Sequence, residues 1–186
     1  LSTTPRFLYI GVISLERGLY QILQAIYHLK EKGEAVEVHF FGHLKADLRQ
    51  LPIYEAVKSQ VCFYPYADYA TLLQDGRSYW AGLADLLDVG DDYDSYPSKL
   101  FDVMQMGIPV ITSDFPLYKK VVSSADCGIL IEPTNTRALA DAMLLILTNR
   151  EQANKMGKNG QKAINLYYNW ETEAERLVNF YLSVKN

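Results

Sequence analysis

Short apolar runs typical of buried strands alternate with amphipathic helical patterns along the whole chain. The run 7–13 has the continuous apolar character of a strand buried on both faces. Leucine and isoleucine then recur at helical spacing from Leu19 to Leu29, and Gly33 supplies a stop. The alternation predicts further strands at 36–41, 61–64, 80–86, 109–112 and 127–131, and further helices at 69–74, 98–106, after Asn135, at 151–165 and from Trp170.

This alternation is typical of an α/β fold, here a Rossmann-like parallel sheet of about six strands with helices on both faces. Asp68 and Asn135 are suited to cap the helices that follow them. The stretch 45–57 predicts a helical piece that Pro52 interrupts. Acidic residues at 171, 173 and 175 suit the positive amino end of the last helix.

The composition of the chain restricts its class. With 186 residues and 49% hydrophobic residues, it can bury one full core, so we expect one domain over 1–186. The net charge of -4 and the scattered lysines and arginines argue against a nucleic-acid partner. Cys62 and Cys127 each lie in an apolar run without metal-ligand spacing, which favours buried thiols. No apolar run approaches ~20 residues and residues 1–5 are unlike a signal peptide, so we expect a cytoplasmic protein.

Two carboxylates, Asp94 and Asp102, lie on either side of a predicted helix start and have seven residues between them. Ser98 can cap this helix, and its free backbone N–H groups form a site suited to an anion. Lys99 lies in the first turn, where it opposes the helix dipole unless an anion is bound nearby. An alternative is a plain surface pair between Lys99 and Asp102, which lie on one stripe of the helix.

Other roles for the two carboxylates remain open. A metal would need further ligands, which the acidic residues Asp88, Asp91 and Asp92 could supply. A carboxylate pair could also serve hydrolysis, or accept hydrogen bonds from pairs of sugar hydroxyls.

In open parallel sheets, ligands bind beyond the carboxyl ends of the strands, so the loops that follow strands have the greatest weight. Arg17 follows the first strand and could neutralise a diphosphate, or be a solvated loop residue. His43 follows the second strand and is either a ligand contact or incidental. Tyr64, Tyr66 and Tyr69 offer flat surfaces to a base, although burial explains most tyrosines in such positions.

Several common ligand-binding and catalytic motifs are absent from the sequence. The segment 11–18 lacks the G-x-G-x-x-G pattern of dinucleotide-binding domains, and no P-loop pattern occurs. Neither a G-x-S-x-G elbow nor a convincing set of Ser, His and Asp is present.

The whole chain resembles the C-terminal, donor-binding half of GT-B glycosyltransferases. It is most similar to the retaining family 4 (group 1) enzymes of bacterial polysaccharide and lipopolysaccharide assembly. Four segments carry the resemblance, at 9–18, 97–111, 127–133 and 168–170 with the helix that follows. The order and spacing of these segments together are specific.

The resemblance implies roles for particular residues. Asp94 and Asp102 occupy the positions of a Glu-x(7)-Glu motif, so Asp94 is the expected catalytic carboxylate facing the donor sugar and Asp102 the expected ribose ligand. The resemblance places the diphosphate at Arg17 and at Lys99 with its helix start, and the base near Pro65 and Tyr66. The expected donor-binding residues are Arg17, Gly18, His43, Tyr66, Ser98, Lys99, Leu100 and Asp102. No metal or other cofactor is expected, since fixed positive groups stabilise the departing nucleotide in such enzymes.

The chain departs from the family pattern at several positions. Both motif carboxylates are Asp, one methylene shorter than Glu, and Ser95-Tyr96-Pro97 replaces a glycine-rich run. Val12 stands where a second basic residue is common, which leaves the diphosphate to Arg17 and Lys99. The resemblance implies that an N-terminal acceptor-binding half lies outside this chain, which alone is expected to bind a donor at best.

The resemblance also implies partners. The intact enzyme is expected to transfer a sugar, with retained configuration, from a UDP- or GDP-linked donor to a glycan or lipid-linked acceptor. That expectation leaves open an association with the inner face of the membrane. The helix after Trp170 is expected to expose an apolar face, open to an oligomer contact. The alternatives are a catalytically inactive nucleotide- or partner-binding module of the same fold and a GT-B epimerase, which no residue supports.

Overall fold

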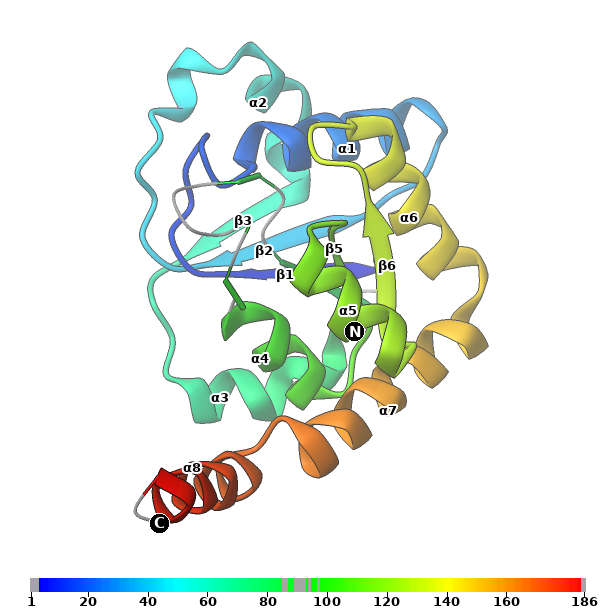
Figure 1. Ribbon diagram of the computed structural model, residues 1–186. Helices are drawn as coiled ribbons and strands as arrows, with labels where there is room; N and C mark the ends of the chain where they lie inside the picture. Colours follow the sequence, from blue (N-terminus) through cyan, green and yellow to red (C-terminus); the bar gives the residue numbers. More distant parts are fainter. Residues whose placement is uncertain (1–3, 85–86, 89–92, 94, 97, 185–186) are drawn as a thin grey trace.

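A single parallel sheet of six strands organises the chain, in the order β3-β2-β1-β4-β5-β6 (Figure 1). The computed structural model describes residues 4–84, 87, 88, 93, 95, 96 and 98–184. The strands are β1 (Arg6–Ile10), β2 (Glu37–Phe41), β3 (Val61–Tyr64), β4 (Ala81–Leu83), β5 (Val110–Ser113) and β6 (Gly128–Ile131). The predicted α/β fold with about six parallel strands is confirmed.

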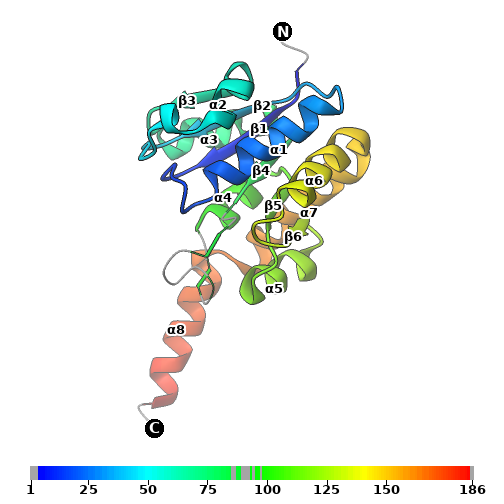
Figure 2. The same ribbon diagram turned by 90° about the horizontal axis from the view of Figure 1, so that it is seen from above.

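Helices cover both faces of this sheet (Figure 2). They are α1 (Leu19–Glu31), α2 (Pro52–Val57), α3 (Tyr69–Asp75), α4 (Ser98–Met106), α5 (Pro116–Ala125), α6 (Thr136–Thr148), α7 (Arg150–Tyr167) and α8 (Trp170–Val184), with three short 3-10 turns at 48–50, 58–60 and 76–78. Residues of α1, α2 and α6 form one core with the sheet, and residues of α3, α4 and α5 form the other. Helix α7 contributes Ala153 to the first core and Ala163 to the second.

The buried strands show why the sequence forms a two-sided sheet. In β1, Phe7 and Tyr9 belong to the first core and Leu8 to the second, because alternate side chains of a strand point to opposite faces. All three side chains are almost fully buried. A continuous apolar run is therefore the expected pattern for this strand.

Gly82 explains an apparent weakness of β4, since glycine is unusual within a strand. A Cβ placed on Gly82 would lie 2.4 Å from a methyl carbon of Val103 in α4. The missing side chain therefore lets α4 pack directly on the sheet. This contact fixes the helix that carries Lys99 and Asp102 relative to the central strands.

Most predicted elements are confirmed within a few residues, as are the predicted caps of α3 and α6. The side chain of Asp68 accepts a hydrogen bond from the backbone of Thr71, and that of Asn135 accepts one from Ala138. The prediction for Pro52 was wrong, and one helix was missed. Pro52 begins α2 at its first position, where a missing N–H costs nothing, and does not interrupt a helix. Helix α5 was not predicted at all.

Both cysteines are free thiols. Cys127 is buried, as predicted, and burial raises its pKa to about 12. Cys62 is only half-buried, so the prediction of a buried thiol was wrong there.

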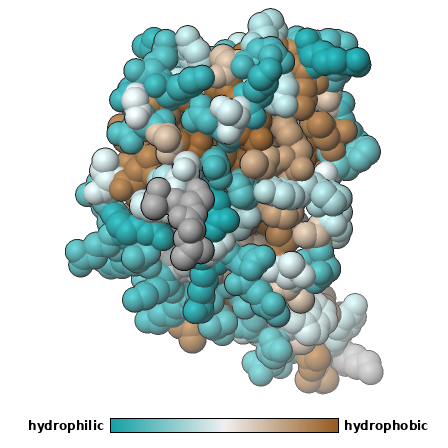
Figure 3. All heavy atoms as spheres, turned by 180° about the vertical axis from the view of Figure 1, so that it is seen from behind, coloured by the Kyte–Doolittle hydropathy of each residue, from teal (hydrophilic) through white to brown (hydrophobic). Residues whose placement is uncertain are grey.

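Helix α8 extends away from the body of the domain and has no buried residues (Figure 1). Its aromatic and aliphatic side chains are exposed, including Trp170 at 73% and Tyr181 at 65%. Figure 3 shows hydrophobic atoms at the surface of this protruding helix. The expected exposed apolar face is thus present. None of the helices in the described part of the chain has the length and apolar character needed to span a bilayer.

Candidate functional site

The order in which strands are added to the sheet reverses at its centre, between β1 and β4. Strand β1 has β2 on one side and β4 on the other, so the chain moves outward in opposite directions from this point. In doubly wound sheets, this arrangement opens a crevice beyond the carboxyl ends of the two central strands. The segments that follow β1 and β4 therefore border the candidate site.

Two glycines bring the ends of β1 and β2 into close contact. Gly11 and Gly42 have positive φ angles of 121° and 143°, which favour glycine. A Cβ placed on Gly42 would lie 2.0 Å from the carbonyl oxygen of Gly11. The two following segments run in parallel, because Ile13 N–H donates to the carbonyl of His43 at 2.9 Å and Lys45 N–H donates to that of Ile13 at 2.9 Å.

Lys99 lies against this glycine pair although it is 88 positions away in sequence from Gly11 (99 − 11). A Cβ placed on Gly11 would lie 2.7 Å from Cε of Lys99, so the lysine stem occupies the space that a side chain would fill. The ammonium nitrogen lies 5.8 Å from the ring centroid of Tyr9. A cation near an aromatic face is stabilised by the ring quadrupole. The end of β1 therefore carries a positive charge in a defined position.

Arg17 and Gly18 lie in the turn between β1 and α1. The backbone N–H of Arg17 donates to the carbonyl of Ser14 at 3.2 Å, and Gly18 adopts a left-handed conformation with φ of 88°. Helix α1 has no side-chain cap and no acidic residue in its first turn. Its amino end is consequently positive and lies beside the same edge of the sheet as Lys99.

Helix α4 begins at Ser98. Ser98 is exposed and is the first residue within the helix, so the prediction that it caps the helix was wrong. Asp102 is half-buried one turn further along. Leu100 is fully buried in the second core. Any contact of Leu100 with a ligand would therefore be made by its backbone.

His43 and Tyr66 follow β2 and β3 and are both exposed, Tyr66 at 79%. The structure brings the backbone of His43 to the glycine pair through its bond from Ile13. Tyr64, by contrast, stacks on Phe41 with ring centroids 4.7 Å apart. One face of Tyr64 is thus used in packing although the residue is 38% exposed, and Tyr66 is the more open of the two.

Asp94 lies outside the described residues, as do Asp91 and Asp92 of the acidic segment. The carboxylate of Asp88 accepts a hydrogen bond from the backbone of Tyr93 at 3.1 Å. Within the residues that the structure describes, no group of three or more potential metal ligands is found.

Two features of this site were not predicted from the sequence. One is the contact between Gly11 and Gly42, and the other is the placement of Lys99 beside Gly11 and Tyr9. The sequence did contain a signal for the contact between the two glycines, because each of them directly follows an apolar strand. No local pattern could have indicated the second.

The parallel sheet, the switch between β1 and β4 and the positive carboxyl edge together define a Rossmann-like ligand-binding domain. Comparison with known proteins identifies which one. The model of the family "Glycosyl transferases group 1" matches residues 2–163, so the chain belongs to this family of glycosyltransferases.

Individual relatives agree with this assignment. The chain is similar to the alpha-D-kanosaminyltransferase of Streptomyces kanamyceticus, with 20% identity over 186 residues that cover 99% of this chain and 47% of the relative. The chain therefore spans about half the length of this relative. The fold is like that of sucrose-phosphate synthase from Thermosynechococcus elongatus, with a TM-score of 0.77, 20% identity and coverage of 98% of this chain and 46% of that one. It is also like that of Anabaena HepE in complex with UDP, with a TM-score of 0.81, 12% identity and coverage of 97% and 49%.

Proposed function

We propose that this chain binds a nucleotide-sugar donor at the carboxyl edge of its sheet, as the donor domain of a retaining glycosyltransferase. The observation that carries the proposal is the positive charge of Lys99 beside the glycine pair at the switch point, in a member of the group 1 family. The absence of a side chain at Gly11 leaves room for the stem of Lys99, which places its ammonium group at the end of β1.

The diphosphate would lie between Arg17 and Lys99. Both side chains belong to segments that border the crevice, and the amino ends of α1 and α4 add partial positive charge there. Fixed cations and helix ends can stabilise the negative charge that develops on the departing nucleotide. For this reason we propose that transfer needs no metal ion or other cofactor.

The remaining donor contacts follow from the resemblance. We propose that Asp102 binds the ribose hydroxyls and that Asp94 faces the sugar near the reacting carbon. The base would lie beside Pro65 and the exposed Tyr66, with His43 nearby. UDP is the first nucleotide to test, because HepE, a protein of the same fold, was solved with UDP; GDP is the second.

The acceptor side would be supplied by a further domain outside this chain. Two observations support this, namely the coverage of about half of the relatives and the uncovered apolar face of α8. We propose that the intact enzyme transfers the sugar to a glycan or lipid-linked acceptor in polysaccharide or lipopolysaccharide synthesis, in the cytoplasm or at the inner face of the membrane. Contact between copies through α8 is the alternative use of its exposed face.

Calorimetry of the 186-residue chain with UDP, GDP and ADP tests donor binding. We expect saturable binding of one nucleotide, weakened about tenfold or more in Arg17→Ala and Asp102→Ala, because each removes a charge-assisted hydrogen bond. Arg137→Ala and Asp141→Ala on the exposed surface of α6 are matched controls and should leave the affinity unchanged. Chelation of divalent metals should also leave it unchanged. A folded sample that binds none of the nucleotides would contradict the proposal.

A second candidate is a catalytically inactive nucleotide- or partner-binding module of the same fold. Val12, in place of a basic residue, and the shortened carboxylates at 94 and 102 favour it. The two candidates differ in the intact protein. Nucleotide binding without consumption of any nucleotide sugar would favour the inactive module.

A further inference from the structure

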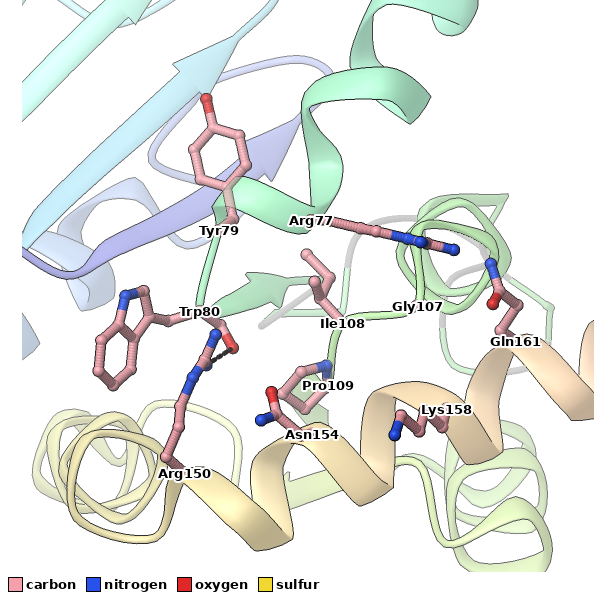
Figure 4. Close-up of a pocket in the computed structure, with 10 residues that line it drawn as sticks. All are labelled: Arg77, Tyr79, Trp80, Gly107, Ile108, Pro109, Arg150, Asn154, Lys158 and Gln161. Atoms are coloured by element: carbon pink, nitrogen blue, oxygen red, sulfur yellow. Dashed lines mark hydrogen bonds between the residues drawn. The ribbon is translucent and has the colours of Figure 1, made fainter. Parts of the chain in front are cut away.

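A second positively charged site lies at the opposite edge of the sheet. A pocket of about 300 Å³ is lined by residues that precede β4 and β5 and by one face of α7 (Figure 4). Trp80 directly precedes β4 and Pro109 directly precedes β5, so the pocket lies at the amino ends of the strands. Its volume is at the lower end of the range of small-molecule sites.

The charge of this pocket is one-sided. Arg77, Arg150 and Lys158 line it together with the amides of Asn154 and Gln161. None of the ten lining residues, all of which the structure describes, is acidic. A chain with a net charge of -4 thus gathers three cations around one small cavity. Grouping like charges without an anion is unfavourable.

Arg150 is held in place before any ligand arrives. Its guanidinium carbon lies 4.2 Å from the ring centroid of Trp80, and its Nη1 donates to the carbonyl of Trp80 at 3.5 Å (Figure 4). Half-burial lowers the pKa of this guanidinium. Because guanidinium carries five N–H donors, most of them stay available to a planar or tetrahedral anion.

Helix α7 places several polar side chains on the face that lines the pocket. Arg150, Asn154 and Lys158 are spaced by four residues, which places them on one face of the helix. Gln161 lies one turn further on, and its amide donates to the carbonyl of Gln105 at 3.0 Å. Figure 4 shows Arg77 reaching toward this end of the pocket from the other side. Cations therefore border the cavity at both ends.

A simpler explanation is that these cations neutralise the negative ends of helices. Arg77 follows α3 and lies near the end of α4 at Gly107, so helix dipoles could account for it. Helix dipoles account less well for the other two cations. Arg150 follows the end of α6 at Thr148 by two residues but is also the first residue of α7, so the two helix ends act on it in opposite directions. Lys158 lies in the middle of α7, where the dipole of that helix offers it no negative end.

From this geometry we propose that the amino-edge pocket binds a small anion carrying phosphate groups. Arg150 and Lys158 on α7 and Arg77 opposite them would contact the phosphate oxygens, while Asn154 supplies a further donor. The site is distinct from the proposed donor site and does not depend on it. Helix α4 runs between the two, with Lys99 at one end and Gly107 at the other.

Trp80 provides a local reporter for this site. The chain has two tryptophans, so in a Trp170→Phe background the fluorescence arises from Trp80 alone. We expect pyrophosphate to change this fluorescence saturably, inorganic phosphate to act similarly but with weaker affinity, and citrate to show whether carboxylates substitute for phosphate. Calorimetry of the same titrations counts the binding sites.

Substitutions then locate the site. Arg77→Gln and Lys158→Gln, at exposed side chains, should each raise the dissociation constant for pyrophosphate about tenfold. Lys155→Gln removes the same charge from the same helix outside the pocket and is the matched control. Arg17→Gln, at the proposed donor site, should leave the Trp80 fluorescence response unchanged, and any pyrophosphate bound at the carboxyl edge is then counted separately by calorimetry. The proposal is wrong if neither method detects binding, if the four variants bind alike, or if only Arg17→Gln weakens binding.

Discussion

At the carboxyl edge of the sheet, the positive charge of Lys99 lies against glycine backbone, whereas at the amino edge three cations line a pocket made of side chains. Helices α1 and α4 begin at the first edge, and α4 ends at the second. The carboxyl edge is therefore built from helix ends and main-chain atoms. Any substitution of Gly11 or Gly42 disturbs the packing there. The amino edge depends on solvent-accessible side chains such as Lys158, which can change without repacking the core.

Among the substitutions that test this difference between the two edges, Gly42→Ala is expected to have the largest effect, a loss of stability. A Cβ there would lie 2.0 Å from the carbonyl oxygen of Gly11, in a backbone with φ of 143°. We expect a loss of about 3 kcal/mol in the free energy of unfolding, measured with urea. Gly33→Ala is the control, since φ is also positive at 82° but nothing lies within 4 Å. Its cost should be only about 1 kcal/mol. Similar losses for the two variants would show that the glycine contact does not constrain the carboxyl edge.

A crossed pair of variants gives the next largest effect. Lys99→Gln should weaken UDP binding about tenfold and leave the pyrophosphate response of Trp80 intact, because it removes one charge-assisted contact at the carboxyl edge. Lys158→Gln should do the reverse. Circular dichroism of each variant checks that the fold is retained. If either substitution alters both titrations equally, the two edges do not act as separate sites.

A smaller effect is expected of pH on the free energy of unfolding, through His39 in β2, a strand that runs from one edge of the sheet to the other. His39 in β2 is buried and lies 3.2 Å from the hydroxyl of Tyr79, a lining residue of the amino-edge pocket. Burial lowers the pKa of His39 despite the carboxylate of Glu37 nearby. The unfolded chain then binds the proton more readily than the folded one, so stability falls as the pH drops below about 6.5.

Urea denaturation between pH 7.5 and 5.5 measures this effect. His39→Gln should flatten the dependence on pH, whereas His43→Gln, at an exposed position, should not. An unchanged slope in His39→Gln would mean that another group titrates in this range.

Local sequence signals predicted most of the fold. The strand at Val61–Tyr64 and the helix at Ser98–Met106 were predicted with the boundaries that the structure has, because apolar runs and a terminal glycine define them. Helix α5 was missed for a physical reason. It has no side-chain cap, and it ends at Asp126 in a left-handed conformation where glycine is usual.

The candidate site could be predicted only in part. The rule for parallel sheets indicated the edge at which Arg17, His43, Tyr66 and Lys99 lie. It could not indicate that the stem of Lys99 fills the space beside Gly11, since this depends on tertiary packing. The amino-edge pocket was invisible to sequence patterns, because its residues come from the separate segments 77–80, 107–109 and 150–161.

Helix α8 has no buried residues, so the two cores of the domain are complete without it. Deleting residues 170–186 should therefore leave the unfolding midpoint of the body nearly unchanged. Mutations on the exposed face of α8 are likewise free of the packing constraints that act on the sheet. Substitutions in α8 can therefore change what this helix binds without changing how the domain folds. For this reason the same domain could be joined to different partner domains through α8.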